Sequence, residues 1–417
     1  MMYEIFRQAN FIFYIMLAFS GLLIGYRFIY HFYGLFATRK YPCAKANHKY
    51  AIIIPARYES SVIEETLISI QKQDYPAHLI RTFVIVESPE DPTCEICSRY
   101  NNVEVFMRPD LKVKTKGGAL KQFFSAMSKN KHGFDAYFIF DADSVLSSSY
   151  IKEMNKCFDG GYKMALGFRN SKNWNGGWVA ACSSALYIGF NTNHNKFRSR
   201  FFKTSVITGT GFYIAHEIIE NIGGWTFETF TEDLEISLFA ALNNINIAYN
   251  EKAEFFDEQP HTLRISRKQH VRWLRGYHQI APLRRKVMKN AVKERNIGKL
   301  EMSVSIAPVL MSVISIALYI VFAVGFGLVA YINGFEGYYI AFRAVFIVLM
   351  CVYLFFVVYF FAVILGELRC INIKFWNAVR ASFMNPIFFS LFIPCYFIYI
   401  FKKDVEWKPI ERTVSID

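Results

Sequence analysis

The sequence predicts an α/β domain with a mostly parallel, Rossmann-like sheet, inserted between α-helical transmembrane segments. Short runs of β-branched and aromatic residues alternate with helix-like segments between residues 50 and 260, an order typical of parallel sheets. Long apolar stretches lie on both sides of this region. The chain of 417 residues is 53% hydrophobic and 18% aromatic, which is too apolar for an ordinary soluble enzyme.

Six short apolar runs are expected to form the strands. They are residues 50–54, 82–86, 103–107, 136–140, 163–167 and 245–249. A helix is expected after the first run, because Ser61 and Glu64 have the spacing of a capping box. Ligands of such sheets bind at the carboxyl ends of the strands, so the polar residues that follow these runs are the candidates for a site.

An apolar stretch precedes the α/β region. Residues 11–30 are almost wholly apolar and long enough to cross a bilayer. The cations Arg39, Lys40 and Lys45 follow, so the next segment is expected on the cytoplasmic side. Eight scattered cysteines without the spacing of a disulfide framework agree with a reducing compartment. We therefore expect a multi-pass protein of the plasma membrane whose polar domain is cytoplasmic.

Three further apolar stretches follow the α/β region, at residues 303–331, 341–365 and 381–401. Pro386 and Pro394 lie in the third, which predicts a kinked or re-entrant segment. Four crossings would place both chain ends on the outer side, whereas the cations of residues 402–417 favour an inner C-terminus. The sequence leaves this conflict open, and we favour a cytoplasmic tail.

By composition the chain divides into five parts. These are an N-terminal transmembrane helix (8–32), the α/β domain (48–260), basic interface helices (261–300), C-terminal transmembrane helices (301–401) and a basic tail (402–417).

The net charge of +13 is densest in residues 264–299, which hold twelve Lys or Arg and one acidic residue, Glu294. Interspersed apolar and aromatic side chains are typical of helices at a membrane surface. A solvated basic helix is the alternative. No Lys/Arg run is combined with an RNA-binding aromatic motif, so membrane lipids, and not nucleic acid, are the expected partner.

Asp141 and Asp143 directly follow the predicted strand at residues 136–140. In an extended chain, residues i and i+2 project to the same side, so the two carboxylates can share one Mg²⁺ or Mn²⁺, or a cation and a ribose. Acidic residues also end strands as turn or cap residues. The DxD pattern alone therefore does not establish a cation site.

Thr231-Glu232-Asp233 offers a carboxylate for proton transfer. A general base must lie within hydrogen-bond distance of the hydroxyl that it deprotonates, and Asp233 is the candidate. The alternative interpretation is a helix N-terminus that is capped by Thr231 or by the loop before it.

Gln269, Arg272 and Trp273 share one face of a predicted helix, at spacings i, i+3 and i+4. Arg272 offers a planar fork for phosphate oxygens, and Trp273 a flat apolar surface for a sugar ring. Gln269 adds a hydrogen-bonding amide. A membrane-surface helix anchored by its Trp would show the same pattern.

The order of the motifs resembles that of the family 2 glycosyltransferases of GT-A fold. Among them, the processive, membrane-integrated cellulose, hyaluronan, chitin and poly-N-acetylglucosamine synthases are similar in layout. The resemblance covers residues 48–280 by motif and the rest by hydropathy. It depends on residues 55–59, Glu87, Lys116-Gly117, Asp141-x-Asp143, Thr231-Glu232-Asp233 and Gln269-x-x-Arg272-Trp273.

The resemblance implies a nucleotide-sugar donor, a UDP-sugar, and a role for each motif. Glu87 stands where the family usually has an Asp that contacts uracil, which leaves the identity of the base open. Asp143 would bind Mg²⁺ or Mn²⁺, and Asp233 would be the general base. The nucleotide would contact Pro55, Ala56, Tyr58, Glu59, Glu87, Lys116 and Asp141. The diphosphate and acceptor would contact Gly209, Thr210, Gly211, Glu232, Gln269, Arg272 and Trp273, and a tail with Trp407 and Arg412 would fold over the site.

The activity implied is a single displacement that inverts the anomeric centre. The leading interpretation is a processive synthase that threads a β-linked polysaccharide through its membrane helices. The alternative is a single addition to a lipid acceptor, giving a glycolipid, and a third is an inactive membrane partner or channel subunit. The sequence does not fix the sugar, the linkage or the primer, and it leaves a homo-oligomer open.

Overall fold

The computed structural model describes residues 39–113, 115–128, 133–306 and 338–401. It also describes residues 7, 8, 11, 15, 29, 30, 32–37, 321, 324, 325, 327, 328, 331, 332 and 334. Most of the predicted N-terminal span and of the stretch at 303–331 lies outside the described residues. So does the tail, with Trp407 and Arg412.

Eight strands form one mixed sheet in the order β3-β2-β1-β4-β7-β6-β8-β5. Strands β3, β2, β1 and β4 are parallel to one another, whereas β7 runs antiparallel between β4 and β6. β6 and β8 are parallel, and β5 is antiparallel to β8. The strands are β1 (Tyr50–Pro55), β2 (Ile80–Val86), β3 (Val103–Met107), β4 (Ala136–Ile139), β5 (Val145–Leu146), β6 (Met164–Ser171), β7 (Phe212–Ala215) and β8 (Ile247–Asp257).

The six predicted strands are confirmed as β1, β2, β3, β4, β6 and β8. The prediction of a mostly parallel sheet was wrong in its second half, where the sheet is mixed. The short strands β5 and β7 were not predicted. The parallel half nevertheless brings the ends of β1, β2 and β4 to one edge, where ligands of such sheets bind.

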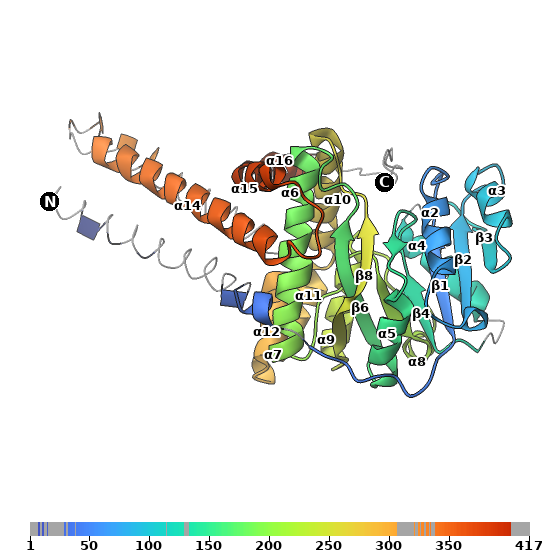
Figure 1. The fold of residues 1–417 in the computed structure, drawn as a ribbon. Helices are drawn as coiled ribbons and strands as arrows, with labels where there is room; N and C mark the ends of the chain where they lie inside the picture. Colours follow the sequence, from blue (N-terminus) through green and yellow to red (C-terminus); the bar gives the residue numbers. More distant parts are fainter. Residues whose placement is uncertain are drawn as a thin grey trace.

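Helices cover both faces of the sheet (Figure 1). Tyr50, Ile52 and Ile54 of β1 enter one core, and Ala51 and Ile53 enter the other, because successive side chains of a strand point to opposite faces. The first core includes α2 (Ile63–Gln71), α3 (Thr93–Ser98) and α5 (Tyr150–Asp159). The second includes α4 (Lys116–Met127), α8 (His216–Asn221) and α9 (Glu232–Leu242). A short 3-10 turn, η1 (Ala77–Leu79), precedes β2.

Helix α2 forms where a helix was expected, but its start differs from the prediction. It begins at Ile63 with Val62 at the N-cap position, and no side chain caps it. The capping box predicted from Ser61 and Glu64 is therefore wrong, and the acidic first turn of Glu64 and Glu65 complements the helix dipole instead.

A further group of helices lies beside the β6–β8 side of the sheet (Figure 1). One uninterrupted rod consists of α6 (Trp178–Tyr187), the π-helical turn η2 (Ile188–Asn193) and α7 (His194–Phe201). The same group includes α10 (Leu263–Gln279), α11 (Ala281–Lys293) and α12 (Ile297–Ser305), which come after β8 in the chain. The basic segment 261–300 is thus helical as expected, and its place at a membrane surface stays a prediction.

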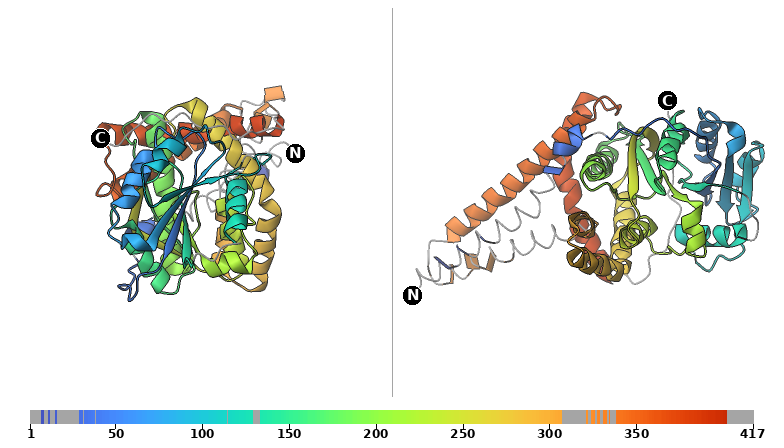
Figure 2. Two further views of the ribbon diagram at one scale, coloured as in Figure 1. Left: turned by 90° about the vertical axis from the view of Figure 1, so that its right-hand side faces the viewer. Right: turned by 90° about the horizontal axis from the view of Figure 1, so that it is seen from below.

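The C-terminal helices differ in how they meet the domain. Helix α14 (Tyr338–Gly366) projects away from it, while α15 (Phe375–Ser390) and α16 (Phe392–Phe401) lie between α14 and the sheet (Figure 2). Within the described residues, Leu349–Gly366 and Phe375–Phe401 are long and apolar enough to cross a membrane, judged by length and composition only.

Helices α15 and α16 pack against the domain along their length. Ala381 and Phe388 belong to a core shared with α6 and α14, and Cys395 belongs to one shared with α10. The ring of Phe392 stacks on His270 of α10 with 4.0 Å between ring centroids. The helix is interrupted at Leu391, five residues after Pro386, in agreement with the predicted kink. This apolar segment therefore runs along the surface of the domain.

Candidate active site

One cavity of about 300 Å³ opens at the carboxyl ends of β1, β2 and β4. It collects residues from every motif singled out in the sequence. The predicted site residues that line it are Pro55, Ala56, Glu59, Glu87, Lys116, Asp141, Asp143, Gly209, Glu232, Asp233, Gln269, Arg272 and Trp273. Tyr58, Thr210 and Gly211 do not line it.

At the β1–β2 end of the cavity, Glu87 lies between two guanidinium groups. Its Oε2 is 2.8 Å from Arg57 Nε, and its Oε1 accepts a hydrogen bond of 2.7 Å from Arg108 Nη1. Arg108 also donates to the carbonyl oxygen of Val113 at 2.6 Å. Both oxygens of Glu87 are therefore engaged by cations that the sequence analysis had not assigned to the site.

Tyr58 takes a different position from its neighbours. Its side chain is exposed, its backbone is left-handed with φ 55°, and its N–H donates to Asp91 Oδ2 at 2.8 Å. This turn aims Glu59 and Arg57 at the cavity and Tyr58 away from it. A contact between Tyr58 and the nucleotide stays a prediction.

Lys116 connects three of the motifs. It opens helix α4, whose N-cap residue Thr115 accepts a hydrogen bond of 3.0 Å from the N–H of Gly118. Its Nζ donates to Asp141 Oδ1 at 2.6 Å and to the carbonyl oxygen of Gly209 at 2.8 Å, and it lies 3.8 Å from Glu232 Oε1. Burial opposes the charge of Lys116, but the carboxylates of Asp141 and Glu232 outweigh burial and raise its pKa.

The loop from Asp141 to Asp143 is held by the glycine-rich segment before β7. The N–H of Asp141 donates to Thr210 Oγ1 at 2.8 Å, and Thr210 Oγ1 is 3.1 Å from Ser144 Oγ. Gly211 lies beneath this loop, where a Cβ would come within 2.2 Å of the Phe255 ring. Thr210 and Gly211 thus support the DxD loop, and their contact with an acceptor stays a prediction.

The donor set suits a hard divalent cation that shares its ligands with a substrate. Asp143 Oδ2 accepts a hydrogen bond of 3.2 Å from the N–H of Glu258, and Asp141 is bound by Lys116. Within the part of the chain that the structure describes, no three His, Cys, Asp or Glu side chains form a ready-made metal site. Mg²⁺ is commonly held by one or two carboxylates plus substrate phosphates, so two carboxylates are sufficient protein ligands.

A second buried carboxylate lies beside the DxD loop at the end of β8. Asp257 accepts hydrogen bonds from Arg169, at 2.8 Å for Nε, and Arg169 lies 3.7 Å from the ring centroid of Tyr187. Burial raises the pKa of Asp257, Arg169 opposes this, and the negative charge of Asp143 adds to it. The sequence analysis missed Asp257, Arg169 and Tyr187. Acidic residues directly after a strand, the signal that singled out Asp141, were also present at Asp257 and Glu258.

Glu232 and Asp233 open helix α9 at the cavity. Burial raises the pKa of Glu232 to about 7, opposed by Lys116 and reinforced by Asp233. Burial also raises the pKa of Asp233, and hydrogen bonds from the backbone of Leu234 and Gly209 oppose it. Thr231 occupies the N-cap position, but its hydroxyl caps no backbone group. The segment therefore supplies carboxylates to the cavity, as the general-base interpretation requires.

Gln269, Arg272 and Trp273 line the cavity from one face of α10. The opposite face, with Val271 and Leu274, packs against α16. Arg272 makes no ion pair with a carboxylate of the described residues, and its Nε is buried without a hydrogen-bond partner there. A guanidinium in this position is ready to bind an anion that enters the cavity.

A glycine permits the close approach of α10 to the acidic motif. A Cβ on Gly276 would lie 2.4 Å from Thr231 Cγ2 and 2.5 Å from its Oγ1. Only a residue without a side chain lets the helix of Arg272 approach Thr231-Glu232-Asp233 this closely.

A mixed α/β sheet of this order, with an acidic loop at the end of β4, defines the class of the protein as a glycosyltransferase of GT-A-like fold. Residues 47–276 match the family model described as "Glycosyltransferase like family 2". The match covers more than half of the chain, so the chain belongs to glycosyltransferase family 2.

The relatives of this chain have names that refer to different products. The chain is 25% identical over 247 residues to the probable glycosyltransferase YdaM of Bacillus subtilis, covering 55% of each chain. It is 24% identical over 227 residues to the poly-beta-1,6-N-acetyl-D-glucosamine synthase of Staphylococcus epidermidis, covering 53% of each. It is 22% identical over 207 residues to the beta-monoglucosyldiacylglycerol synthase of Trichormus variabilis, covering 47% of this chain and 42% of that one. The chain thus spans about half the length of these relatives.

Among solved structures, a mannosyltransferase of Pyrobaculum calidifontis in complex with GDP-mannose and Mn²⁺ has a similar fold. The TM-score is 0.54 at 13% identity, over 94% of this chain and 99% of that chain. The similarity therefore includes the helices outside the sheet domain.

Proposed function

We propose that this protein is an inverting glycosyltransferase that moves a sugar from a UDP-sugar to an acceptor hydroxyl at a membrane. The observation that carries the proposal is the cavity that joins Asp141, Asp143 and Asp233 to Arg272, whose guanidinium makes no ion pair with a carboxylate of the described residues. These groups supply what the reaction needs: a base for the acceptor and positive charge for the departing diphosphate.

Asp233 is the proposed general base. It lies half-buried at the start of α9, and burial raises its pKa toward the range in which a carboxylate accepts a proton readily. It would take the acceptor's hydroxyl proton while the oxygen attacks the anomeric carbon. One carboxylate is sufficient for a single displacement, and an α-linked donor would give a β-linked product.

Arg272 is the proposed partner of the leaving diphosphate. Its planar guanidinium stabilises the charge that develops on the phosphate oxygens as the anomeric bond breaks. Asp143 and Asp141 would hold Mg²⁺ or Mn²⁺, which supplies further positive charge to the diphosphate when bound. Gln269 and Trp273, on the same face of α10, would orient the donor sugar.

The nucleotide is proposed to bind at the β1–β2 end, against Pro55, Ala56, Glu59 and Glu87. The resemblance to UDP-sugar enzymes supports uracil as the base. Glu87 keeps acceptor capacity for a base N–H, because each carboxylate oxygen has two lone pairs and each is used once by an arginine. Arg57 and Arg108 would set the position of that carboxylate.

The membrane arrangement is also a proposal. Residues 48–260 would form a cytoplasmic catalytic domain, followed by interface helices (261–300). If Phe375–Phe401 stays on the surface of this domain, as its contacts with α6 and α10 indicate, it does not cross the bilayer. The tail then lies on the catalytic side, and the conflict between the number of crossings and the basic tail disappears. Processive polysaccharide synthesis, expected from the sequence, has the resemblance to poly-N-acetylglucosamine synthase in its favour, whereas the resemblance to beta-monoglucosyldiacylglycerol synthase favours a lipid acceptor.

The purified protein should be incubated with labelled UDP- and GDP-sugars and Mg²⁺ or Mn²⁺. We expect release of the nucleotide diphosphate from a UDP-sugar. Asp233→Asn should lower transfer by about 10²–10⁴-fold, and Arg272→Ala should lower kcat by about 10²–10³-fold. Arg284→Ala changes an arginine on α11 that lies outside the cavity and serves as the matched control. Near-normal turnover of Asp233→Asn, or loss of donor affinity alone in Arg272→Ala, would refute the assigned roles.

A further inference from the structure

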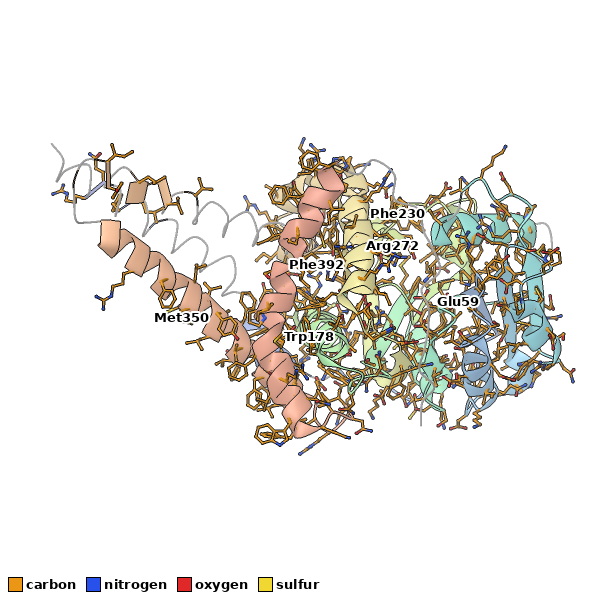
Figure 3. The ribbon with its side chains drawn as sticks, turned by 90° about the horizontal axis from the view of Figure 1, so that it is seen from above. Glu59, Trp178, Phe230, Arg272, Met350 and Phe392 are labelled. Atoms are coloured by element: carbon orange, nitrogen blue, oxygen red, sulfur yellow. The ribbon has the colours of Figure 1, made fainter. Side chains whose placement is uncertain are left out.

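The two ends of the cavity differ in chemistry. The β1–β2 end is lined by charged groups, among them Glu59, Glu87 and Arg108. Toward α12 and α16 the lining also includes His194 and Ser305, together with six apolar side chains: Leu186, Phe190, Val206, Leu234, Ile306 and Phe392. In Figure 3, Arg272 lies between Glu59 on one side and Phe392 on the other. Four of the six apolar side chains are aliphatic. A sugar or an oligosaccharide has few apolar groups to place against them, whereas an acyl chain matches them.

The apolar end lies where the sheet domain meets the candidate membrane helices. Ile306 directly follows α12, at the point where the long apolar stretch of the sequence begins. Phe392 opens α16, the segment between α14 and the domain. A molecule that entered between α12 and α16 would come from the side of the protein that carries its exposed apolar helix surface.

The charges of the cavity favour an uncharged acceptor. Four of its five Lys and Arg side chains are paired with carboxylates of the described residues: Arg57 and Arg108 with Glu87, Lys116 with Asp141, and Arg169 with Asp257. The fifth, Arg272, is assigned to the diphosphate. Within the described residues, a phosphate headgroup beside Glu232 and Asp233 would therefore find no unpaired Lys or Arg of its own, and as a nucleophile it would need no general base.

We propose that the acceptor is a lipid with an uncharged, hydroxyl-bearing headgroup, which reaches Asp233 between α12 and α16. Its acyl chains lie against the apolar end of the cavity. The lipid oxygen forms a bond to the anomeric carbon as the bond from that carbon to the diphosphate breaks. The electron pair leaves with the diphosphate, and the hydroxyl proton passes to Asp233. This inference rests on the proposed transferase activity and names its acceptor class.

The first test compares acceptors with the wild-type enzyme. Acceptor-free hydrolysis of each labelled UDP-sugar establishes the donor, and absence of any hydrolysis or transfer would overturn the proposed activity together with this inference. With that donor, dioleoylglycerol in phosphatidylcholine vesicles should raise UDP release and yield a labelled product that extracts into organic solvent. Stronger stimulation by undecaprenyl phosphate, or by soluble β-linked oligosaccharides, would overturn the acceptor class while leaving the transferase activity in place.

A chain-length series tests the apolar end without any mutation. From dibutyrylglycerol to dioctanoylglycerol, the KM for the acceptor should fall by about tenfold or more, because each buried methylene strengthens binding severalfold. The KM for the donor should not change. A KM that is independent of chain length would show that the acyl chains do not enter the cavity and would overturn the proposal.

One substitution tests the location. Val206 is buried at the apolar end, and Val206→Phe would fill part of that space. It should raise the KM for dioctanoylglycerol by about tenfold, the loss expected when a few methylenes no longer fit, and it should raise the KM for dibutyrylglycerol less. Val105→Phe, on the edge strand β3 away from the cavity, is the matched control. Equal acceptor kinetics for the folded Val206→Phe variant and the control would contradict the proposed path.

Discussion

At the scale of single residues, the site is organised around two adjacent carboxylates that share one lysine. Glu232 is buried and Asp233 half-buried, and the Nζ of Lys116 lies 3.8 Å from Glu232 while it binds Asp141. Burial of both acids raises their pKa values, which makes proton uptake easier than for an exposed carboxylate. Asp233 in this setting is a better base than its ordinary pKa of about 3.9 would allow.

This arrangement predicts the pH dependence of the reaction. Transfer needs Asp233 ionised, so kcat/KM should fall as the pH decreases through its raised pKa, and the acid limb should lie above the ordinary aspartate value. Lys116→Met removes a positive charge that lowers the pKa of Asp233, so it should shift the limb to higher pH. The measurement is a pH profile of kcat/KM at saturating cation.

Glu220→Gln, at a side chain that is 73% exposed on α8, is the control and should leave the profile unchanged. An identical acid limb in wild type and Lys116→Met would show that the neighbouring lysine does not affect the pKa of the base.

The sequence predicted those site residues that belong to compact motifs, such as Asp141, Asp143 and Asp233. It did not identify Arg108 or Arg169, because isolated arginines in a strongly basic chain carry no spacing signal, and it assigned no role to Arg57 within the segment 55–59. Their importance comes from ion pairs across the fold: Arg169 meets Asp257, 88 residues later in the chain. Such pairs depend on strand order, which no local pattern encodes.

At the scale of secondary-structure elements, the relative position of α9 and α10 depends on Gly276. Gly276→Ala should push α10 away from Thr231, because the added Cβ would overlap that side chain. We expect a loss of about 1–3 kcal/mol in the free energy of unfolding. Activity should fall further, by up to about 10²-fold, since small misplacements of catalytic groups are costly.

Thermal unfolding and kcat together measure the effect. The Thr231→Ala/Gly276→Ala double variant restores the space, and the hydroxyl of Thr231 has no hydrogen-bond partner among the described residues, so it should recover much of both quantities. If the double variant were as inactive as Gly276→Ala, steric overlap with Thr231 would not be the cause.

Strands of ordinary length were predictable, because a strand that is buried on both faces appears in the sequence as a short continuous apolar run. The two residues of β5 are too few to give such a run. The four residues of β7 directly follow the Gly209–Gly211 segment, which had been assigned to the acceptor. Strand direction was the larger error. The antiparallel insertion of β7 between β4 and β6 changes the sheet from parallel to mixed, and hydrophobic pattern does not distinguish the two.

At the scale of the whole molecule, hydropathy identified apolar segments but not their surroundings. Residues 381–401 and 341–365 look alike in the sequence, yet Phe388 and Cys395 are buried against α6 and α10 along the domain. Among the described side chains of α14, those near its C-terminal end, Phe360, Val363 and Ile364, enter the core shared with α6. An apolar helix side satisfies the same sequence pattern whether it faces lipid or protein. Only the tertiary contacts separate these cases.

Buried ion pairs on α7 join the sheet domain to the helices on either side. His194 Nε2 lies 2.9 Å from Glu301 Oε1 of α12, and Arg198 pairs with the same carboxylate. Lys196 Nζ donates to Glu367 Oε1 at 2.5 Å, directly after α14, and lies 3.6 Å from Glu251 of β8. One helix thus holds α12 and the end of α14 to the catalytic domain through charges that are removed from water.

The Lys196–Glu367 pair gives a test of this connection. Lys196→Met leaves Glu367 buried beside Glu251 without its cation, and removal of one member of a buried pair costs about 3–5 kcal/mol. Lys196→Met/Glu367→Met removes both charges and should regain most of this loss, because well-packed apolar replacements of buried pairs are often neutral. Denaturant unfolding of the four proteins in the cycle, in detergent, measures the coupling. A coupling below about 0.5 kcal/mol would mean that the pair does not join α14 to the domain, and that apolar packing of α15 against α6 and α14 alone holds the helices in place.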